Sequence, residues 1–314
     1  MKKDVMLWTG AGQIGMAIAR RMGSGMKIVV GDKKLENAQK IAEIMNSAGF
    51  DAEPTEMDIS DRSSIKALIE KGLGYGNIKM LVNAAGVSPS QASIETILKV
   101  DLYGTAVLLE EVGKVISEGG VGVTISSQSG KRMPQLTAEE DALLACTETE
   151  KLLELDILKP ENIRDTLHAY QMAKRCNEKR VMAESVKWGE RKARINSISP
   201  GIIVTPLAID EFNGPRGDFY KNMFAQCPAG RPGTADEVAN AAELLMSEKV
   251  HLSQEVTYYA MAEQQQAIIT VRLNHKYNEK AVLRLYFADT IPLLQYFYRK
   301  HLTEFYFECI IFIA

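Results

Sequence analysis

Short apolar runs alternate with amphipathic segments along the first 248 residues of the chain. The apolar runs have the length of buried strands and lie at 5–9, 27–30, 53–57, 80–83, 121–126 and 193–198. Between them apolar residues recur at helical spacing, over the longest stretches at 61–71, 92–117 and 166–188. Strands separated by helix-length segments predict βαβ units and a parallel sheet covered on both faces. We therefore expect a three-layer, doubly wound α/β fold.

Two parts of the chain depart from this alternation. Residues 128–165 carry two candidate helix starts, at Thr137 and Thr147, each with the spacing of a capping box. We interpret this segment as an insertion of short helices between a strand and the next long helix. From 250 to 314 the chain becomes aromatic and polar without periodicity. We therefore predict one domain at 1–249 and a separate tail at 250–314.

The composition excludes several classes of protein. The 314 residues are 46 % hydrophobic and 25 % charged, and the formal net charge of −3 gives no basic footprint for nucleic acid. No apolar run reaches the ~18 residues of a membrane span, and the N-terminal strand lacks the features of a signal peptide. The four cysteines show neither a CxxC pair nor metal-ligand spacing, so we expect no metal. The expected compartment is the cytoplasm.

The first predicted strand runs into the turn GAGQIG at 10–15, which has the G-x-G-x-x-G pattern. Gly10 permits the tight turn, Gly12 lets the backbone approach a pyrophosphate, and Gly15 lets the next helix pack closely on the sheet. The helix start offers free N–H groups to phosphates. The pattern alone fits a plain glycine-rich turn equally well. The predicted dinucleotide contacts in this turn are Gly10, Gly12, Gln13, Ile14 and Gly15.

Asp32 ends the second predicted strand, 17 positions after Gly15. A carboxylate there accepts hydrogen bonds from the ribose hydroxyls of NAD and repels the 2′-phosphate of NADP. The same residue also suits the N-cap of the following helix. Lys33 and Lys34 weaken the preference, because a nearby cation tolerates a 2′-phosphate. We expect a Rossmann-type site for NAD, with NADP as the alternative.

From here the sequence resembles the short-chain dehydrogenase/reductase family, whose motifs follow in family order. They are DI at 58–59, NAAG at 83–86, ISS at 125–127, YQMAK at 170–174 and PGIIVT at 200–205. The resemblance covers residues 5–248, and five motifs on the expected elements make coincidence improbable. It implies further cofactor contacts at Asp58, Ile59, Asn83, Ala84, Ala85, Gly86, Tyr170, Lys174, Pro200, Gly201, Ile203 and Thr205.

The Y-x-x-x-K motif supplies a tyrosine and a lysine that can act together in proton transfer. Tyr170 and Lys174 are four positions apart and share one face of a helix. A tyrosine pKa near ~10 falls beside an ammonium, so Tyr170 can exchange a proton with a substrate oxygen while hydride moves at the nicotinamide. The resemblance implies that Lys174 bonds the nicotinamide ribose, Ser127 the substrate oxygen and Thr205 the carboxamide. Ser127 is preferred to its neighbouring serines because the family uses the second serine of I-S-S.

Three features depart from the family pattern. The glycine motif is not the T-G-x-x-x-G-x-G of the Y-x-x-x-K subgroup. Asp101 replaces the fourth catalytic residue, an asparagine whose backbone carbonyl holds a water leading to the lysine. An aspartate keeps that backbone role, but its charge opposes ionisation of Tyr170 if it sits close. Ser127 and Tyr170 are 43 positions apart, so the insertion at 128–165 adjoins the active site, where we expect a lid that shapes the substrate pocket with 206–230.

The tail lacks the family's seventh strand, which reads I-T-G-x-x-x-x-x-D-G-G. The codons that can encode residues 250–265 contain a second reading frame, which begins at the third base of the first codon. That frame permits A-F-I-T-G-S-D followed by L-L-C-D-G-G-A-T. We therefore predict a frameshift product from about residue 250 and a sheet without its last strand. The alternative is a genuine extension that binds a partner or a membrane surface. Homo-oligomers are typical of the family but doubtful with this C-terminus.

These observations predict a nicotinamide-dependent oxidoreductase that moves hydride between the cofactor and a small-molecule alcohol or carbonyl. A rival hypothesis is a non-catalytic dinucleotide-binding protein, either because Asp101 disables the relay or because the frameshifted C-terminus inactivates the chain. A third is an epimerase or dehydratase on the same fold.

Overall fold

The computed structural model describes residues 3–214, 217–227, 229–248, 257–260, 268–272 and 282–286. The chain divides into two compact units, residues 1–265 and 266–314. In the second unit the described residues are two antiparallel strands, β8 (Ile268–Arg272) and β9 (Val282–Tyr286). The first unit holds the sheet and all the predicted site residues.

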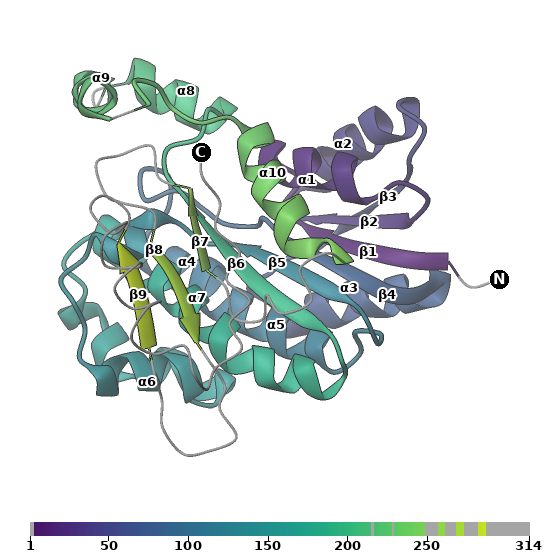
Figure 1. Ribbon diagram of the computed structural model, residues 1–314, viewed down its shortest axis with the longest axis horizontal. Helices are drawn as coiled ribbons and strands as arrows, with labels where there is room; N and C mark the ends of the chain where they lie inside the picture. Colours follow the sequence, from purple (N-terminus) through teal and green to yellow (C-terminus); the bar gives the residue numbers. More distant parts are fainter. Residues whose placement is uncertain are drawn as a thin grey trace, which may run out of the picture. The chain divides into compact units, whose positions relative to one another are not determined.

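A seven-stranded parallel sheet forms the centre of the first unit (Figure 1), in the order β3-β2-β1-β4-β5-β6-β7. Its strands are β1 (Lys3–Thr9), β2 (Lys27–Asp32), β3 (Asp51–Glu56), β4 (Gly76–Asn83), β5 (Val121–Ile125), β6 (Arg194–Pro200) and β7 (Thr257–Ala260). The chain winds outward in one direction from β1 to β3 and in the other from β4 onward. Ligands of such sheets bind at the carboxyl ends of the strands beside this switch point. The predicted doubly wound α/β fold is confirmed.

Helices cover both faces of the sheet, which confirms the three predicted layers. Met6 and Trp8 of β1 face one core, and Val5 and Leu7 face the other, as alternation along a strand requires. The first core is covered by α1 (Gln13–Met22), α2 (Leu35–Ser47) and α10 (Ala235–Met246). The second is covered by α3 (Arg62–Tyr75), α5 (Thr105–Gly113) and α7 (Thr166–Glu190).

A continuous helical run replaces the single helix predicted at 92–117. It consists of α4 (Ile94–Ile97), the π-helical η1 (Leu98–Gly104) and α5. A π-helical stretch widens the turn and re-aims its side chains, which is why such stretches are frequent at functional sites. Asp101 lies in the middle of η1.

Residues 128–165 form a group of short helical segments. They are η2 (Gln128–Lys131), α6 (Ala138–Cys146), η3 (Thr149–Glu154), η4 (Asp156–Leu158) and η5 (Pro160–Asn162). The capping box predicted at Thr137 is present, with Glu140 as its partner. The one predicted at Thr147 is wrong: this residue ends α6, its N–H donates to Leu143, and the next turn begins at Thr149. Apolar residues of α6 and η3 pack with η1 and α7 in a third core.

The sheet has a last strand, which corrects the prediction that it would be missing. β7 pairs in parallel with β6, from Ser197 opposite Thr257 to Pro200 opposite Ala260. The backbone groups along the edge of β6 accept any extended segment, and two tyrosines and a threonine favour extended structure. The compact unit therefore continues past residue 249 to 265. Apart from β7, β8 and β9, the tail predicted to be out of frame lies outside the described residues.

Candidate active site

The glycine-rich turn stands at the carboxyl end of β1. Gly10 has φ +81°, in the left-handed region, and a Cβ there would lie 2.6 Å from the backbone of Ala85. A Cβ on Gly15 would collide with the indole of Trp8, whereas one on Gly12 would meet no described atom within 4 Å. Helix α1 begins directly after Gly12 without a side-chain cap. The turn therefore presents open backbone N–H groups of the kind that bind phosphates.

Asp32 ends β2 with its carboxylate directed at this turn. The N–H of Ala11 donates to Oδ2 at 2.9 Å, and the N–H of Lys34 donates to Oδ1 at 2.9 Å. The N-cap position of α2 belongs to Lys34 rather than to Asp32, so the N-cap alternative is not what the structure shows.

Lys33, the neighbouring cation, is engaged elsewhere. Its ammonium lies 2.8 Å from the carboxylate of Asp58, just after β3. Burial alone would raise the pKa of Asp58, but hydrogen bonds from Lys33 and Ser60 outweigh it and hold that pKa below its usual range. Ile59, the next predicted contact, is buried beneath η1, where a Cβ on Gly104 would press on its carbonyl.

The N-A-A-G segment at the end of β4 ties three elements together. Thr9 of β1 donates its hydroxyl to Oδ1 of Asn83 at 2.8 Å, and Nδ2 of Asn83 lies 3.4 Å from the Thr105 hydroxyl of α5. The N–H of Ala84 donates to the carbonyl of Thr9 at 2.9 Å. Asn83 is buried, so its side chain supports the switch point from within.

Lys174 of α7 reaches Asp101 of η1. The lysine Nζ lies 3.5 Å from Oδ2 of Asp101, with the side chains 6 % and 0 % exposed, respectively. The N–H of Val87 donates to Oδ1 at 2.8 Å, and the lysine also donates to the Ile125 carbonyl at 3.4 Å. A Cβ on Gly86 would lie 3.3 Å from the carboxylate and 3.4 Å from the ammonium. The absence of a side chain at Gly86 therefore leaves the space in which the Asp101 carboxyl group and the Lys174 ammonium approach each other.

Burial and neighbouring charges shift the pKa values of both Asp101 and Lys174. Burial raises the pKa of Asp101, because losing water penalises the carboxylate more than Lys174 compensates. Burial alone would lower the pKa of Lys174, but attraction to Asp101 and Tyr170 outweighs it and raises that pKa. Lys174 is therefore held as a cation, whereas burial disfavours the charged form of its neighbour Asp101.

Tyr170 and the serines complete this part of the site. The Lys174 ammonium is 5.3 Å from the centroid of the Tyr170 ring. Tyr170 is half-buried, as is Ser127, which caps the N-terminus of η2 and accepts the N–H of Ser129 at 3.2 Å. Ser126 is buried and donates to the carbonyl of Lys174 at 2.7 Å. Ser126 therefore serves the packing of α7, while Ser127 is the serine partly accessible from outside.

The P-G-x-x-x-T loop leaves β6 at Pro200 and Gly201. Ile203 forms a bridge with Gly233, and the hydroxyl of Thr205 accepts the N–H of Ala208 at 3.2 Å, at the start of α8 (Pro206–Asn213). The loop, the glycine-rich turn, the N-A-A-G segment and the I-S-S serines all follow carboxyl ends of neighbouring parallel strands. The topology thus brings the predicted motifs to one edge of the sheet.

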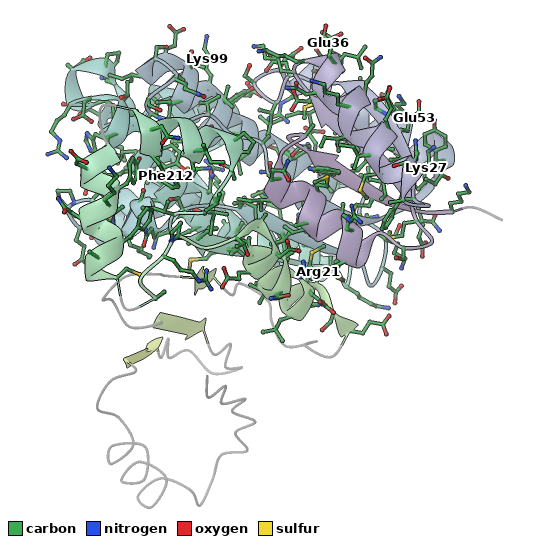
Figure 2. The ribbon with its side chains drawn as sticks, turned by 90° about the horizontal axis from the view of Figure 1, so that it is seen from above. Arg21, Lys27, Glu36, Glu53, Lys99 and Phe212 are labelled. Atoms are coloured by element: carbon green, nitrogen blue, oxygen red, sulfur yellow. The ribbon has the colours of Figure 1, made fainter. Side chains whose placement is uncertain are left out.

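The aromatic residues after this loop pack on one another. Phe212 of α8 (labelled in Figure 2) meets Tyr220 and Phe224 of α9 (Gly217–Gln226) edge to face, at 5.2 and 5.3 Å between ring centroids. Arg132, just after η2, contacts the sulfur of Met223 at 3.7 Å. The start of the insertion therefore touches the segment with which it was predicted to share the substrate side.

A buried carboxylate beside Lys174, that of Glu178, was not predicted from the sequence. Glu178 lies one turn beyond Lys174 on α7, with its side chain 2 % exposed. The sequence contains a signal for it. Position 178 follows 170 and 174 at the same four-residue spacing, which places Glu178 on the helix face that packs inward.

Comparison with known protein families matches nearly all of the first unit. A model described as short chain dehydrogenase matches residues 4–138, and one described as enoyl-(acyl carrier protein) reductase matches residues 138–257. The short-chain dehydrogenase/reductase bsc3 of Alternaria brassicicola is 36 % identical over 247 residues, covering 78 % of this chain and 90 % of that protein. D-threitol dehydrogenase of Mycolicibacterium smegmatis is 28 % identical and covers 78 % and 86 %.

Solved structures share the fold. A short-chain dehydrogenase/reductase from Serratia marcescens superposes with a TM-score of 0.63 at 19 % identity, over 82 % of this chain and 96 % of that one. A variant of actinorhodin polyketide ketoreductase, solved with NADPH, gives a TM-score of 0.65 at 20 % identity, over 83 % and 96 %.

Proposed function

The chain belongs to the short-chain dehydrogenase/reductase family and is an oxidoreductase that acts on alcohol or carbonyl groups. From this premise we propose that it uses NAD and that Tyr170 exchanges the proton with a small-molecule substrate. The observation that carries the proposal is the buried Lys174 ammonium, 5.3 Å from the Tyr170 ring at the ligand-binding edge of the sheet.

The residues present fit a dinucleotide. A Cβ on Gly12 would meet no described atom within 4 Å, so the space beside the turn is open, and the uncapped start of α1 supplies N–H donors. The carboxylate of Asp32 favours ribose hydroxyls over a 2′-phosphate. The Lys33 ammonium, which would attract that phosphate, is paired with Asp58. These contacts support NAD as the cofactor.

The chain's own residues would carry the proton. In the direction of oxidation the Tyr170 phenolate accepts the proton of the alcohol, and in reduction the phenol returns a proton to the substrate oxygen. The Lys174 ammonium favours the phenolate, and the Ser127 hydroxyl donates a hydrogen bond to the substrate oxygen. Thr205 is proposed to hold the carboxamide. The nicotinamide supplies the site that accepts or donates hydride.

Tyr170→Phe tests the proposal. The variant should bind NADH with the parent's Kd, followed by nicotinamide fluorescence, and lose turnover by about 100-fold or more. Suitable probes are the alcohols named by relatives: D-threitol, a 7α-hydroxysteroid and cis-4-hydroxycyclohexanecarboxylate. Turnover equal to that of the parent would contradict the proposal. NADH binding without turnover of any probe by the parent would favour the non-catalytic alternative, and turnover without net change in the cofactor would favour an epimerase or dehydratase.

Asp32→Asn tests the choice of cofactor. Loss of the charge should tighten NADPH relative to NADH by about tenfold, whereas Asp58→Asn, which releases Lys33, should act in the same direction more weakly. An unchanged ratio of the two Kd values in both variants would count against NAD as the preferred cofactor.

The remaining expectations stay predictions. We propose that the insertion at 128–165 shapes the substrate side, supported by the contact of Arg132 with Met223. No helix among the described residues is long and apolar enough to cross a membrane. The cytoplasmic location and the homo-oligomer rest on the sequence and the family resemblance.

A further inference from the structure

A carboxylate that the proposed mechanism does not use lies beside the catalytic lysine. Glu178 follows Lys174 by four positions, as Lys174 follows Tyr170, so the three residues stand in one row along α7. The Glu178 side chain is 2 % exposed. A buried carboxylate is costly unless its oxygens are bonded, so its partners account for its position.

Each oxygen of Glu178 contacts a different segment. The Ser199 hydroxyl donates to Oε1 at 2.7 Å, and the Lys131 ammonium lies 3.2 Å from Oε2. Ser199 is fully buried on β6, directly before Pro200. Lys131 ends η2, four positions after Ser127. The carboxylate therefore joins α7 both to the start of the P-G-x-x-x-T loop and to the start of the insertion.

A side-chain hydrogen bond and a close backbone approach show that residues 126–130 pack directly on α7. The Ser126 hydroxyl donates to the carbonyl of Lys174 at 2.7 Å. A Cβ on Gly130 would lie 2.7 Å from the backbone nitrogen of Arg175, so η2 meets α7 without room for a side chain. Close packing of this kind transmits shifts between the packed segments, and this contact links α7 to the backbone that follows Ser127.

We propose that Glu178 is a positioning residue of the active site, which sets the places of Ser127 and Thr205 relative to Tyr170. The inference rests on the proposed function. Through Oε2 and Lys131, Glu178 acts on Ser127, the serine proposed to bond the substrate oxygen. Through Oε1 and Ser199, it acts on the loop with Thr205, which is proposed to hold the carboxamide. Rate is sensitive to such placement, since an error of about 1 Å costs about 100-fold.

Two substitutions separate the contacts. Glu178→Gln keeps an oxygen that accepts from Ser199 but loses the attraction for Lys131. It should lower kcat/KM by about tenfold or more, while the Kd for NADH stays within about twofold of the parent. Ser199→Ala removes the other contact and should raise the Kd for NADH about fivefold. Glu178→Ala, which removes both, should show both effects.

Glu184 and Lys187 provide matched controls. Glu184 is also buried on α7 and pairs with Lys187 at 2.7 Å, but it lies farther along the helix from Tyr170. Glu184→Gln and Lys187→Met should change thermal stability without changing kcat/KM or the Kd for NADH. If the role of Glu178 were purely structural, Glu178→Gln would likewise change thermal stability but neither kcat/KM nor the Kd for NADH.

The outcomes are distinguishable. The inference is overturned, and the proposed function left intact, if Glu178→Gln and Ser199→Ala change kcat/KM and the Kd for NADH in the same way as each other. It is also overturned if the two variants lower only the melting temperature. The NADH measurement needs no substrate: a Kd raised equally by the two variants already overturns it. If the parent does not bind NADH, or if Tyr170→Phe turns over like the parent, the proposed function fails and the inference falls with it.

Discussion

The ammonium of Lys174 lies 3.5 Å from the carboxylate of Asp101, and both side chains are withdrawn from water. A buried charge persists where an opposite charge compensates it. The lysine proposed to activate Tyr170 thus has a carboxyl group as its neighbour, where the family pattern has a neutral amide. The strength of Tyr170 as a base therefore depends on the charge of Lys174 and on the ionisation of Asp101.

Asp101→Asn should move the pH dependence of alcohol oxidation toward lower pH. The aspartate opposes ionisation of Tyr170, so its removal lowers the pKa of the tyrosine and shifts the acid limb of kcat/KM by about one unit. The pH profile measures this shift, and Glu111→Gln, a buried carboxylate bonded to Lys114, is the control. A shift toward higher pH would show instead that Lys174 loses its proton without Asp101.

Two alanine substitutions in the glycine-rich turn should separate cofactor binding from stability. Gly12→Ala adds a methyl group where no described atom lies within 4 Å. The protein should fold as the parent but bind NADH about tenfold or more weakly, because the methyl group blocks approach of the pyrophosphate. Gly15→Ala drives its Cβ into Trp8 and should cost about 1–3 kcal/mol of unfolding free energy. Equal melting temperatures for the two variants would contradict this assignment.

Glu110 should contribute stability that disappears in acid. Burial raises its pKa, but hydrogen bonds from Lys114 and Arg62 outweigh burial and lower it from 4.5 to about 2. A depressed folded-state pKa adds stability above pH 4.5, which is lost as the pH falls toward 2. Glu110→Gln should therefore cost about 1–2 kcal/mol at neutral pH and less at pH ~3. Urea unfolding at both pH values measures it, with the exposed Glu95→Gln as control.

Restoring the alternative reading frame from residue 250 should stabilise the protein. The repaired strand would carry the apolar residues expected beside β6, so the melting temperature should rise by about 2–4 °C per kcal/mol gained. Sequencing the coding DNA across residues 245–265 tests the premise directly. An unbroken frame together with a less stable repaired chain would establish the tail as genuine.

Strands β1 to β6 and the long helices were predictable because their patterns are local. Apolar runs of strand length and helical periodicity appear in the sequence wherever an element buries one face. Thr147 was misjudged because its capping-box spacing occurs in a residue that ends a helix instead. β7 was missed because backbone pairing with β6 does not depend on the side-chain motif that was sought.

The site residues that belong to sequence motifs were predictable. The interactions that depend on contacts between distant segments of the chain were not. Asp101 and Lys174 are 73 positions apart, and their meeting depends on the π-helical turn of η1 and on Gly86. Glu178 carries no motif, and its partners come from two other segments of the chain. Such relationships follow from the packing of elements, which periodicity does not encode.

The order of the strands also bears on how the protein is made. Every residue proposed to bind the cofactor or the substrate oxygen precedes Pro206, and β7 is the last element added to the sheet. During synthesis, strands β1 to β6 and all these residues leave the ribosome before the edge strand exists. The residues proposed to bind the cofactor are therefore common to the products of both reading frames, so a bound cofactor would stabilise either product against unfolding and degradation.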